Sequence, residues 1–333
     1  MKFLAALLVL AAFPVHAATL EAGKGRTFAL PSAAIAAASA GDTIAIDQGV
    51  YFDCAVVTKD RLTMIGMGDG AVMTDKTCQG KAILVISGRD VILRNLVLTR
   101  ARVPDRNGAG IRAEGDNLTI ERVRFINNEN GILAADAPNS TIRIRDSEFT
   151  DNGRCAPECA HGLYVGHIKE LDVQTTRFFR TYNGHHVKSR AANTILIGND
   201  IADGPDGAAS YMVDIAEGGD LLMRQNTLAK GPKTASNRVV VLGAEKPGLV
   251  GSAQFIDSNM LTDDGAGVSA LVLNWGAGDP VVARNTVPKG VDQVSTSGSL
   301  FHRAHVWLYE WKVSLMNGPG FAKRVVKAIL ARV

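Results

Sequence analysis

The chain is patterned as a series of short β-strands that repeat along its length. Segments such as LTIERVRF (118–125), IRIRDSEF (142–149) and LDVQTTRF (171–178) share one alternation of apolar and polar residues, and related segments recur at intervals of about 23 to 33 residues. Alternation with a period of two is typical of strands. The first inward apolar position of each repeat is predicted at Leu93, Ile120, Ile144, Val173, Leu196, Met223, Ile256 and Val282. No helix-length apolar period separates the strands, so the repeat predicts a parallel β-solenoid rather than βαβ units.

A polar residue stands three positions after the inward residue in most repeats. These polar positions are Ser147, Thr176, Asn199, Asn226, Asn259 and Asn285. Polar side chains that share one register and point into a turn can hydrogen-bond to the coils above and below, as stacked Asn ladders do. We therefore expect a polar ladder along one turn of the solenoid.

Each repeat also contains a second short strand. These strands are GIRAE (110–114), GILAA (131–135), GLYVG (162–166), HHVKSR (185–190), SYMVDI (210–215), RVVVLG (238–243) and SALVLN (269–274). In this two-strand repeat the chain resembles the right-handed parallel β-helix, or pectin-lyase-like, superfamily over roughly residues 25–295. The resemblance implies an all-β fold with a single right-handed parallel β-helix of about nine coils, which we place at residues 42–295.

The two ends of the solenoid need covers that keep its open coils from water. Residues 18–41 are predicted to form the N-terminal cap, with a short Ala-rich helix that Ser32 N-caps and Gly41 ends. Residues 296–333 are predicted to form a basic, amphipathic, helical tail. We expect its Trp-containing half to cap the C-terminal end. Its last dozen residues either do the same or make peripheral contact with an anionic membrane surface.

The first 17 residues have the pattern of a secretory signal peptide. Lys2 precedes an apolar run that is too short to span a bilayer, and small residues mark a cleavage site after Ala17 or one residue later. We therefore expect a periplasmic or secreted protein. In an oxidising compartment its four cysteines are expected to form two disulfides. The expected pairs are Cys155 with Cys159, which closes a small loop, and Cys54 with Cys78.

Composition and charge limit the classes of partner that the protein is expected to bind. The 333 residues are 46% hydrophobic and 21% charged, so the chain can bury a sizeable core. The formal net charge of +3 is too small for an electrostatic nucleic-acid binder, so we expect no nucleic-acid partner. We expect the protein to be a monomer.

Alternation along the second strands predicts a cluster of titratable side chains on the outer face of the solenoid. With apolar residues such as Ile111, Leu163 and Val187 placed inward, the outward set is Arg112, Glu114, Tyr164, His186, Lys188, Arg190 and Asp214. Either Tyr211 or Met212 joins this set, and His161 and His185 stand at the mouths of their strands. Neighbouring coils are about 4.8 Å apart, so residues on three successive coils converge within ~10 Å. No core requires these residue types.

The cluster suits chemistry on an acidic sugar. Lys188 and Arg190 can hold the carboxylate of a uronate, the arginine as a bidentate fork. A histidine, a tyrosine or a lysine with a lowered pKa can remove the proton beside that carboxylate. Tyr164 can protonate the leaving oxygen, and Asp214 can orient a histidine or bind a hydroxyl. Arg112, Glu114 and His161 are predicted to bind substrate.

The resemblance implies an activity on polyuronides. Many proteins of this superfamily are polysaccharide lyases, C5-epimerases or hydrolases, and the chondroitinase- and alginate-lyase-like branch uses a Lys and Arg pair that Lys188 and Arg190 match. The chain lacks the Asp-Pro-His motif of mannuronan epimerases and the WIDH stretch of pectate lyases. The segment GHH (184–186) differs from the Gly-His-Gly of polygalacturonases.

The sequence therefore predicts an exported protein that acts on an acidic polysaccharide, most simply as a lyase or epimerase. A non-catalytic polysaccharide-binding β-helix that serves polymer assembly or secretion is the alternative, and a glycoside hydrolase is the third. Asp200, Asp203 and Asp206 cluster in a turn whose oxygen ligands would suit Ca²⁺, and a plain polar turn is the competing interpretation.

Overall fold

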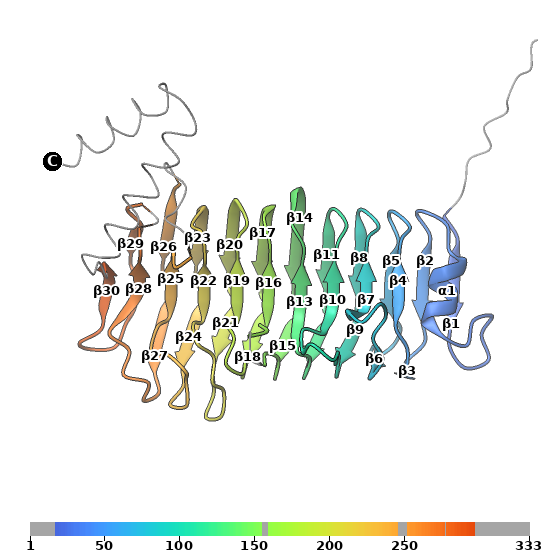
Figure 1. The fold of residues 1–333 in the computed structure, drawn as a ribbon, viewed down its shortest axis with the longest axis horizontal. Helices are drawn as coiled ribbons and strands as arrows, with labels where there is room; N and C mark the ends of the chain where they lie inside the picture. Colours follow the sequence, from blue (N-terminus) through green and yellow to red (C-terminus); the bar gives the residue numbers. More distant parts are fainter. Residues whose placement is uncertain (1–16, 155–158, 246–251, 277, 297–333) are drawn as a thin grey trace, which may run out of the picture.

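The structure is a computed structural model that describes residues 17–154, 159–245, 252–276 and 278–296. It is a parallel β-helix in which each full coil gives one strand to each of three sheets, and the coils follow one another along a single axis (Figure 1). All pairings between the described strands are parallel, and each strand inside a sheet pairs with strands of the coils before and after it. The predicted solenoid of about nine coils is confirmed.

Sheet A carries the first strand of every coil. Its strands are β1 (Thr19–Ala22), β2 (Thr43–Ile46), β5 (Thr63–Gly66), β8 (Val91–Arg94), β11 (Leu118–Glu121), β14 (Ala137–Arg145), β17 (Ile168–Gln174), β20 (Asn193–Ile197), β23 (Asp220–Arg224), β26 (Gln254–Asp257) and β29 (Val281–Ala283). The predicted inward register is confirmed, because Leu93, Ile120 and Ile144 are direct partners and are fully buried.

Sheet B carries the second strand of each full coil. Its strands are β3 (Gly49–Tyr51), β6 (Ala71–Thr74), β9 (Leu96–Thr99), β12 (Arg124–Ile126), β15 (Glu148–Thr150), β18 (Arg177–Phe179), β21 (Asp200–Ala202), β24 (Thr227–Lys230) and β27 (Met260–Asp263). The rings of Phe125, Phe149 and Phe178 stack inside the solenoid at centroid distances of 4.5 and 4.7 Å. These stacked rings fill the core beneath sheet B with large apolar surfaces.

Sheet C carries the third strand of every coil and the candidate site. Its strands are β4 (Ala55–Val57), β7 (Ala82–Ile86), β10 (Ala109–Ala113), β13 (Asn130–Ala134), β16 (Leu163–Val165), β19 (Val187–Ser189), β22 (Val213–Ile215), β25 (Val240–Leu242), β28 (Ala270–Asn274) and β30 (Asp292–Thr296). Leu163, Val187 and Val213 are direct neighbours and fully buried, so the predicted inward set of this sheet is confirmed.

The predicted polar ladder lies in the sharp turn between sheets A and B. The Asn226 side chain donates to the Leu196 carbonyl at 2.9 Å and to Oδ1 of Asn259 at 2.8 Å, and its own Oδ1 accepts from the backbone of Asn199 at 2.9 Å. The residue before each of the later ladder positions adopts a left-handed conformation, as at Gln225 and Ser258. The ladder therefore satisfies the buried backbone groups that this turn leaves unpaired.

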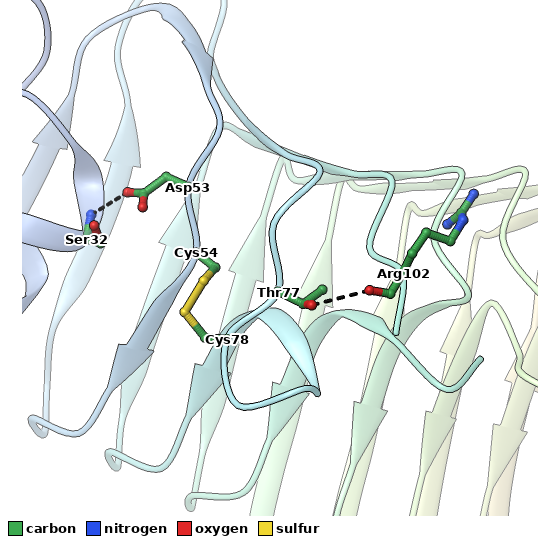
Figure 2. The surroundings of a disulfide bond; sticks show 6 residues. All are labelled: Ser32, Asp53, Cys54, Thr77, Cys78 and Arg102. Carbon is green, nitrogen blue, oxygen red and sulfur yellow. Dashed lines mark hydrogen bonds between the residues drawn. A yellow bond between two sulfur atoms is a disulfide. The ribbon is translucent and has the colours of Figure 1, made fainter. Parts of the chain in front are cut away.

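The short helix α1 (Pro31–Ala37) lies at the N-terminal end of the stack, against β1, β2 and β4 (Figure 1). The predicted start and end of this helix were wrong. Leu30 is the N-cap residue, and Pro31, whose fixed φ suits the first helical position, begins the helix. Ser32 lies inside the first turn and donates its backbone N–H to Asp53 at 2.8 Å (Figure 2). The helix ends at Ala37, before Gly41.

Cys54 and Cys78 form the predicted disulfide, which joins two successive coils just before β4 and β7 (Figure 2). Cys159 is also disulfide-bonded. Its predicted partner Cys155 lies outside the described residues. The predicted signal peptide, apart from its last residue, and the basic tail after Thr296 also lie outside the described residues. Within the described part, no helix is long and apolar enough to cross a membrane.

Candidate functional site

The candidate site lies on the outer face of sheet C, over β16, β19 and β22. Tyr164, Lys188 and Asp214 are direct neighbours in the outward register of these strands. The row is apolar on both sides, because Leu133 precedes Tyr164 and Val241 follows Asp214 at the same position. The alternation correctly placed the three polar residues on this face, where they form a group between apolar neighbours.

A stack of rings runs beside this row, at the turn that enters sheet C. The His161 and His185 rings stack at 4.9 Å, and the His185 and Tyr211 rings stack at 4.5 Å with an interplanar angle of 6°. Tyr164 meets the edge of His161 at 5.3 Å. Tyr211, rather than the fully buried Met212, thus joins the outer surface.

Backbone hydrogen bonds fix the tautomer of both histidines in this stack. Nδ1 of His161 accepts the backbone N–H of His185 at 2.9 Å, and Nδ1 of His185 accepts that of Tyr211 at 3.1 Å. Burial, helped by the positive charge of Lys188, lowers the pKa of His185 to about 3, and burial also holds the pKa of His161 well below its ordinary value. Each ring is therefore neutral and carries its proton on Nε2.

Gly184 explains why His185 reaches this stack. The backbone here passes so close to the preceding coil that a Cβ on Gly184 would lie 1.9 Å from the Ala160 carbonyl oxygen. Only glycine permits this approach without a shift of the backbone.

Asp214 is the most perturbed carboxyl group of the site. Its side chain is only 2% exposed, and Oδ2 lies 3.5 Å from Nε2 of His185 and 3.7 Å from Nζ of Lys188. Oδ1 has no hydrogen-bond partner among the described residues. Burial raises the pKa of Asp214 to about 7, against the opposing effect of the Lys188 charge. Asp214 is thus poised to exchange a proton near neutral pH.

Lys188 and Arg190 together hold the carboxylate of Glu245. The Lys188 ammonium lies 2.5 Å from Oε1, while Nε and Nη2 of Arg190 lie 3.0 and 2.5 Å from Oε2. Burial disfavours the charge of Glu245, but the hydrogen bonds from Lys188 and Arg190 outweigh it and lower its pKa. Arg190 also contacts Glu217 at 3.2 Å. We call this pair of cations, Lys188 and Arg190, the carboxylate clamp.

The ring of Tyr164 supports the carboxylate clamp. It lies 5.0 Å from the Arg190 guanidinium carbon and 5.5 Å from the Lys188 nitrogen, measured from the ring centroid. The ring face attracts both positive charges and keeps the two side chains side by side.

Sequence reasoning missed Glu245, because the residue follows β25 and reaches back over β22 to the coil of Lys188. Alternation within strands cannot predict such a contact. Arg238 was also missed, although its position before a strand of sheet C matches that of Tyr211. The sequence did contain a signal for Arg238, because corresponding places in successive repeats hold His161, His185, Tyr211 and Arg238.

The predicted outward position of His186 was wrong. Its ring is fully buried, where Nδ1 contacts Thr181 Oγ1 at 2.8 Å and Nε2 contacts Asp203 Oδ1 at 2.8 Å. Asp203 in turn lies 3.2 Å from the buried ammonium of Lys230, which was not predicted. The chain bends as it enters sheet C, so the side chain at this position points into the solenoid. Gly131 occupies the same position two coils earlier, and a Cβ added there would likewise point inward, toward Phe149.

Arg112 and Glu114 lie on the same face but apart from the cluster. Arg112 occupies the outward register two coils before Tyr164, with Leu133 between them. Arg112 Nε lies 3.4 Å from Glu114, which also pairs with Lys81 at 2.6 Å. A substrate-binding role for this pair stays a prediction.

The turn proposed for Ca²⁺ has each of its carboxylates beside a cation. Asp200 pairs with Arg177, Asp206 pairs with Lys233, and Asp203 belongs to the buried contact with Lys230. Across the described ranges, no group of three or more His, Cys, Asp or Glu side chains is arranged to hold a metal ion.

Part of the chain matches the model of a known protein family. Residues 47–201 match the family model for the right handed beta helix region. Together with the three parallel sheets, this match confirms the predicted right-handed parallel β-helix. A comparison with curated protein sequences gives no significant match.

Solved structures similar to this chain include pectin methylesterases. One from Aspergillus niger, in a penultimately deglycosylated form, shares 10% sequence identity with a TM-score of 0.40, over 86% of this chain and 92% of that chain. A pectin methylesterase mutant in complex with a hexasaccharide shares 15% identity with a TM-score of 0.38, over 77% of this chain and 70% of that chain.

Proposed function

We propose that this protein is an exported carbohydrate-active enzyme that acts on an acidic polysaccharide by removing the C5 proton of a uronate. One observation carries the proposal: the carboxylate clamp of Lys188 and Arg190 holds a carboxylate, that of Glu245, directly beside Asp214. In this interpretation Glu245 occupies the place of the substrate carboxylate and leaves the clamp when substrate binds.

The clamp would make the C5 proton acidic. Two cations that neutralise the uronate carboxylate stabilise the negative charge that develops when C5 loses its proton. Asp214 is the proposed base, because a carboxylate with a pKa of about 7 accepts protons well near neutral pH. His185 is not the base, since its Nε2 carries a proton, and it serves to position Asp214.

The proposed lyase reaction balances with these groups. Asp214 takes the C5 proton, the C4–C5 double bond forms, the C4–O bond breaks, and Tyr164 gives a proton to the leaving oxygen. In an epimerase no C–O bond breaks, and a proton returns to C5 from the opposite face. Tyr164 lies next to both cations and can act in either reaction.

A glycoside hydrolase is the second candidate, and the pKa values of two carboxyl groups favour it. Asp214 and Glu245 flank the same ammonium of Lys188, and their environments raise the pKa of Asp214 and lower that of Glu245. A protonated acid beside an ionised carboxylate is the pair that hydrolysis of a glycosidic bond requires.

One assay separates these reactions. The protein is incubated with alginate, polygalacturonate, chondroitin sulfate and bacterial exopolysaccharides. Ultraviolet absorbance then detects unsaturated uronate, reducing-end assays detect hydrolysis, and proton NMR detects a changed uronate configuration. We expect absorbance from a lyase or an NMR change from an epimerase. New reducing ends without absorbance would favour the hydrolase. Tight binding without any product would favour the polysaccharide-binding alternative.

Variants connect the activity to the site. Lys188→Ala and Asp214→Asn should each lower kcat/KM by at least about a hundredfold, because each removes a group that contacts the reacting unit. Lys233→Ala is the matched control, since Lys233 is an exposed lysine paired with Asp206. Full activity of Lys188→Ala on the substrate would contradict the proposed site.

A further inference from the structure

We propose that Arg238, Tyr211 and Trp275 form a second anion-binding site, which recognises another acidic unit of the same polymer and sets the minimum chain length. This inference rests on the proposed function. It concerns a group of residues that lies on the coils beyond Lys188 and Arg190.

Arg238 lies against two aromatic side chains. Its guanidinium carbon lies 4.9 Å from the Trp275 ring centroid and 5.8 Å from the Tyr211 ring centroid. Its Nη1 donates to the Tyr211 hydroxyl at 3.1 Å. These contacts restrict the guanidinium before any ligand arrives, so less conformational entropy is lost on binding.

The charge of Arg238 is the feature that points to a ligand. Lys188 and Arg190 both have acidic partners, in Glu245, Asp214 and Glu217. Within the described residues, no carboxylate forms an ion pair with Arg238. A preorganised, half-buried guanidinium that has no acidic partner among the described residues favours a carboxylate or sulfate from outside the chain.

The position of Arg238 fits a polymer that lies along the solenoid axis. Tyr211 stacks on His185 of the coil that carries Lys188, and Arg238 follows Tyr211 one coil further on. Arg238 is thus two coils from the carboxylate clamp, or ~10 Å along the axis. The stacked rings of His185 and Tyr211 lie between the two anion sites, along the path that the sugar units would take.

The test measures affinity against chain length. Oligogalacturonates and oligomannuronates of two to six units are titrated into the wild-type protein and the Arg238→Ala variant by calorimetry. For the wild type, affinity should increase by about tenfold or more at the length that first reaches Arg238. This step should be absent from Arg238→Ala, while the shortest oligomers bind both proteins equally. Arg238→Lys keeps the charge but not the planar guanidinium, so its step should be smaller than in the wild type.

Two controls separate the possible failures. Lys188→Ala should lose affinity at every length, whereas Lys233→Ala should match the wild type. If Lys188→Ala loses binding but Arg238→Ala keeps the full step, the second site is wrong and the proposed function stands. If the panel of acidic polysaccharides identifies another polymer, the same titration uses oligomers of that polymer. If the wild type binds no acidic oligomer at any length, both proposals fail. Thermal unfolding of Arg238→Ala, expected within a few degrees of the wild type, checks that the fold is intact.

Discussion

The ammonium of Lys188 lies 2.5 Å from Oε1 of Glu245, although 57 positions of sequence separate the two residues. The backbone N–H of Glu245 donates to the Ala216 carbonyl at 2.8 Å, which anchors this acidic residue over β22. A carboxylate therefore already occupies the position in which we place the acid group of a substrate. We therefore expect Glu245 to influence the binding of an acidic ligand.

Removing the charge of Glu245 should strengthen the binding of an acidic polymer. In Glu245→Gln the carboxylate clamp no longer holds an internal carboxylate, so a substrate carboxylate has less to displace. We expect the Kd for the preferred acidic oligosaccharide to fall by about threefold to tenfold, which corresponds to roughly 1 kcal/mol of binding free energy. Calorimetric titration measures it.

Glu121→Gln is the control for this change. Glu121 pairs with Arg94 on sheet A and should not affect binding. If Glu245→Gln instead abolished turnover and left the Kd unchanged, Glu245 would be a catalytic carboxylate, as in the hydrolase interpretation.

The activity should depend on the ionisation of Asp214. Because a base must be deprotonated, kcat/KM should rise with pH, with a midpoint near 7, and level off above it. His185, with a pKa of about 3, contributes no second step above pH 5. The negative charge of Glu245 helps to raise the pKa of Asp214, so the midpoint should move to lower pH in Glu245→Gln. A falling profile through pH 7 would make Asp214 an acid.

Asp214 should also affect folding stability. The folded protein keeps the Asp214 proton up to about pH 7, whereas the unfolded chain releases it near the ordinary aspartate value. The protonated group therefore adds its full contribution to the free energy of unfolding below about pH 4, and this contribution is lost as the pH rises through 7. Urea unfolding at pH 5 and pH 8 should show a larger loss of stability for the wild type than for Asp214→Asn.

His167 should also make a small contribution to folding stability that is lost as the pH rises. Its ring lies 3.0 Å from Asp136 and 3.1 Å from Glu217, and hydrogen bonds to these carboxylates raise its pKa. The stabilisation is fully present below the ordinary histidine pKa near 6.5 and is lost as the pH rises through the raised value. Because the ring is half-exposed, solvent weakens the effect.

His167→Gln tests this contribution by removing the pH-dependent part between pH 5 and 8, measured by thermal unfolding. Equal pH dependence of the variant and the wild type would show that the ring does not contribute.

Interrupting the polar ladder should lower the stability of the folded protein. Asn226→Ala removes the donors to the Leu196 carbonyl and to Asn259, and it leaves the backbone of Asn199 without an acceptor. Buried groups without partners are expensive, so we expect a loss of roughly 2 to 4 kcal/mol in the free energy of unfolding. Chemical denaturation measures it. Met260→Ala, at a half-exposed position of the next coil, should change stability by much less.

The repeated core made the solenoid predictable from the sequence. Residues such as Ile120 and Ile144 recur at one register, and each coil can bury them only by stacking on the next. The same alternation correctly placed Tyr164, Lys188 and Asp214 on the outer face. It failed at His186, because the bend before sheet C interrupts the period of two.

The parallel coils, the polar ladder and the outward row of Tyr164, Lys188 and Asp214 could all be read from the chain alone, because they depend on local alternation and on repetition. The occupation of the carboxylate clamp by Glu245 and the burial that raises the pKa of Asp214 became visible only in the folded molecule. The first depends on how a turn two coils beyond Lys188 folds back over the face, and the second depends on the packing around Asp214. Contacts of that kind are set by the packing of coils, which no pattern within a single repeat records.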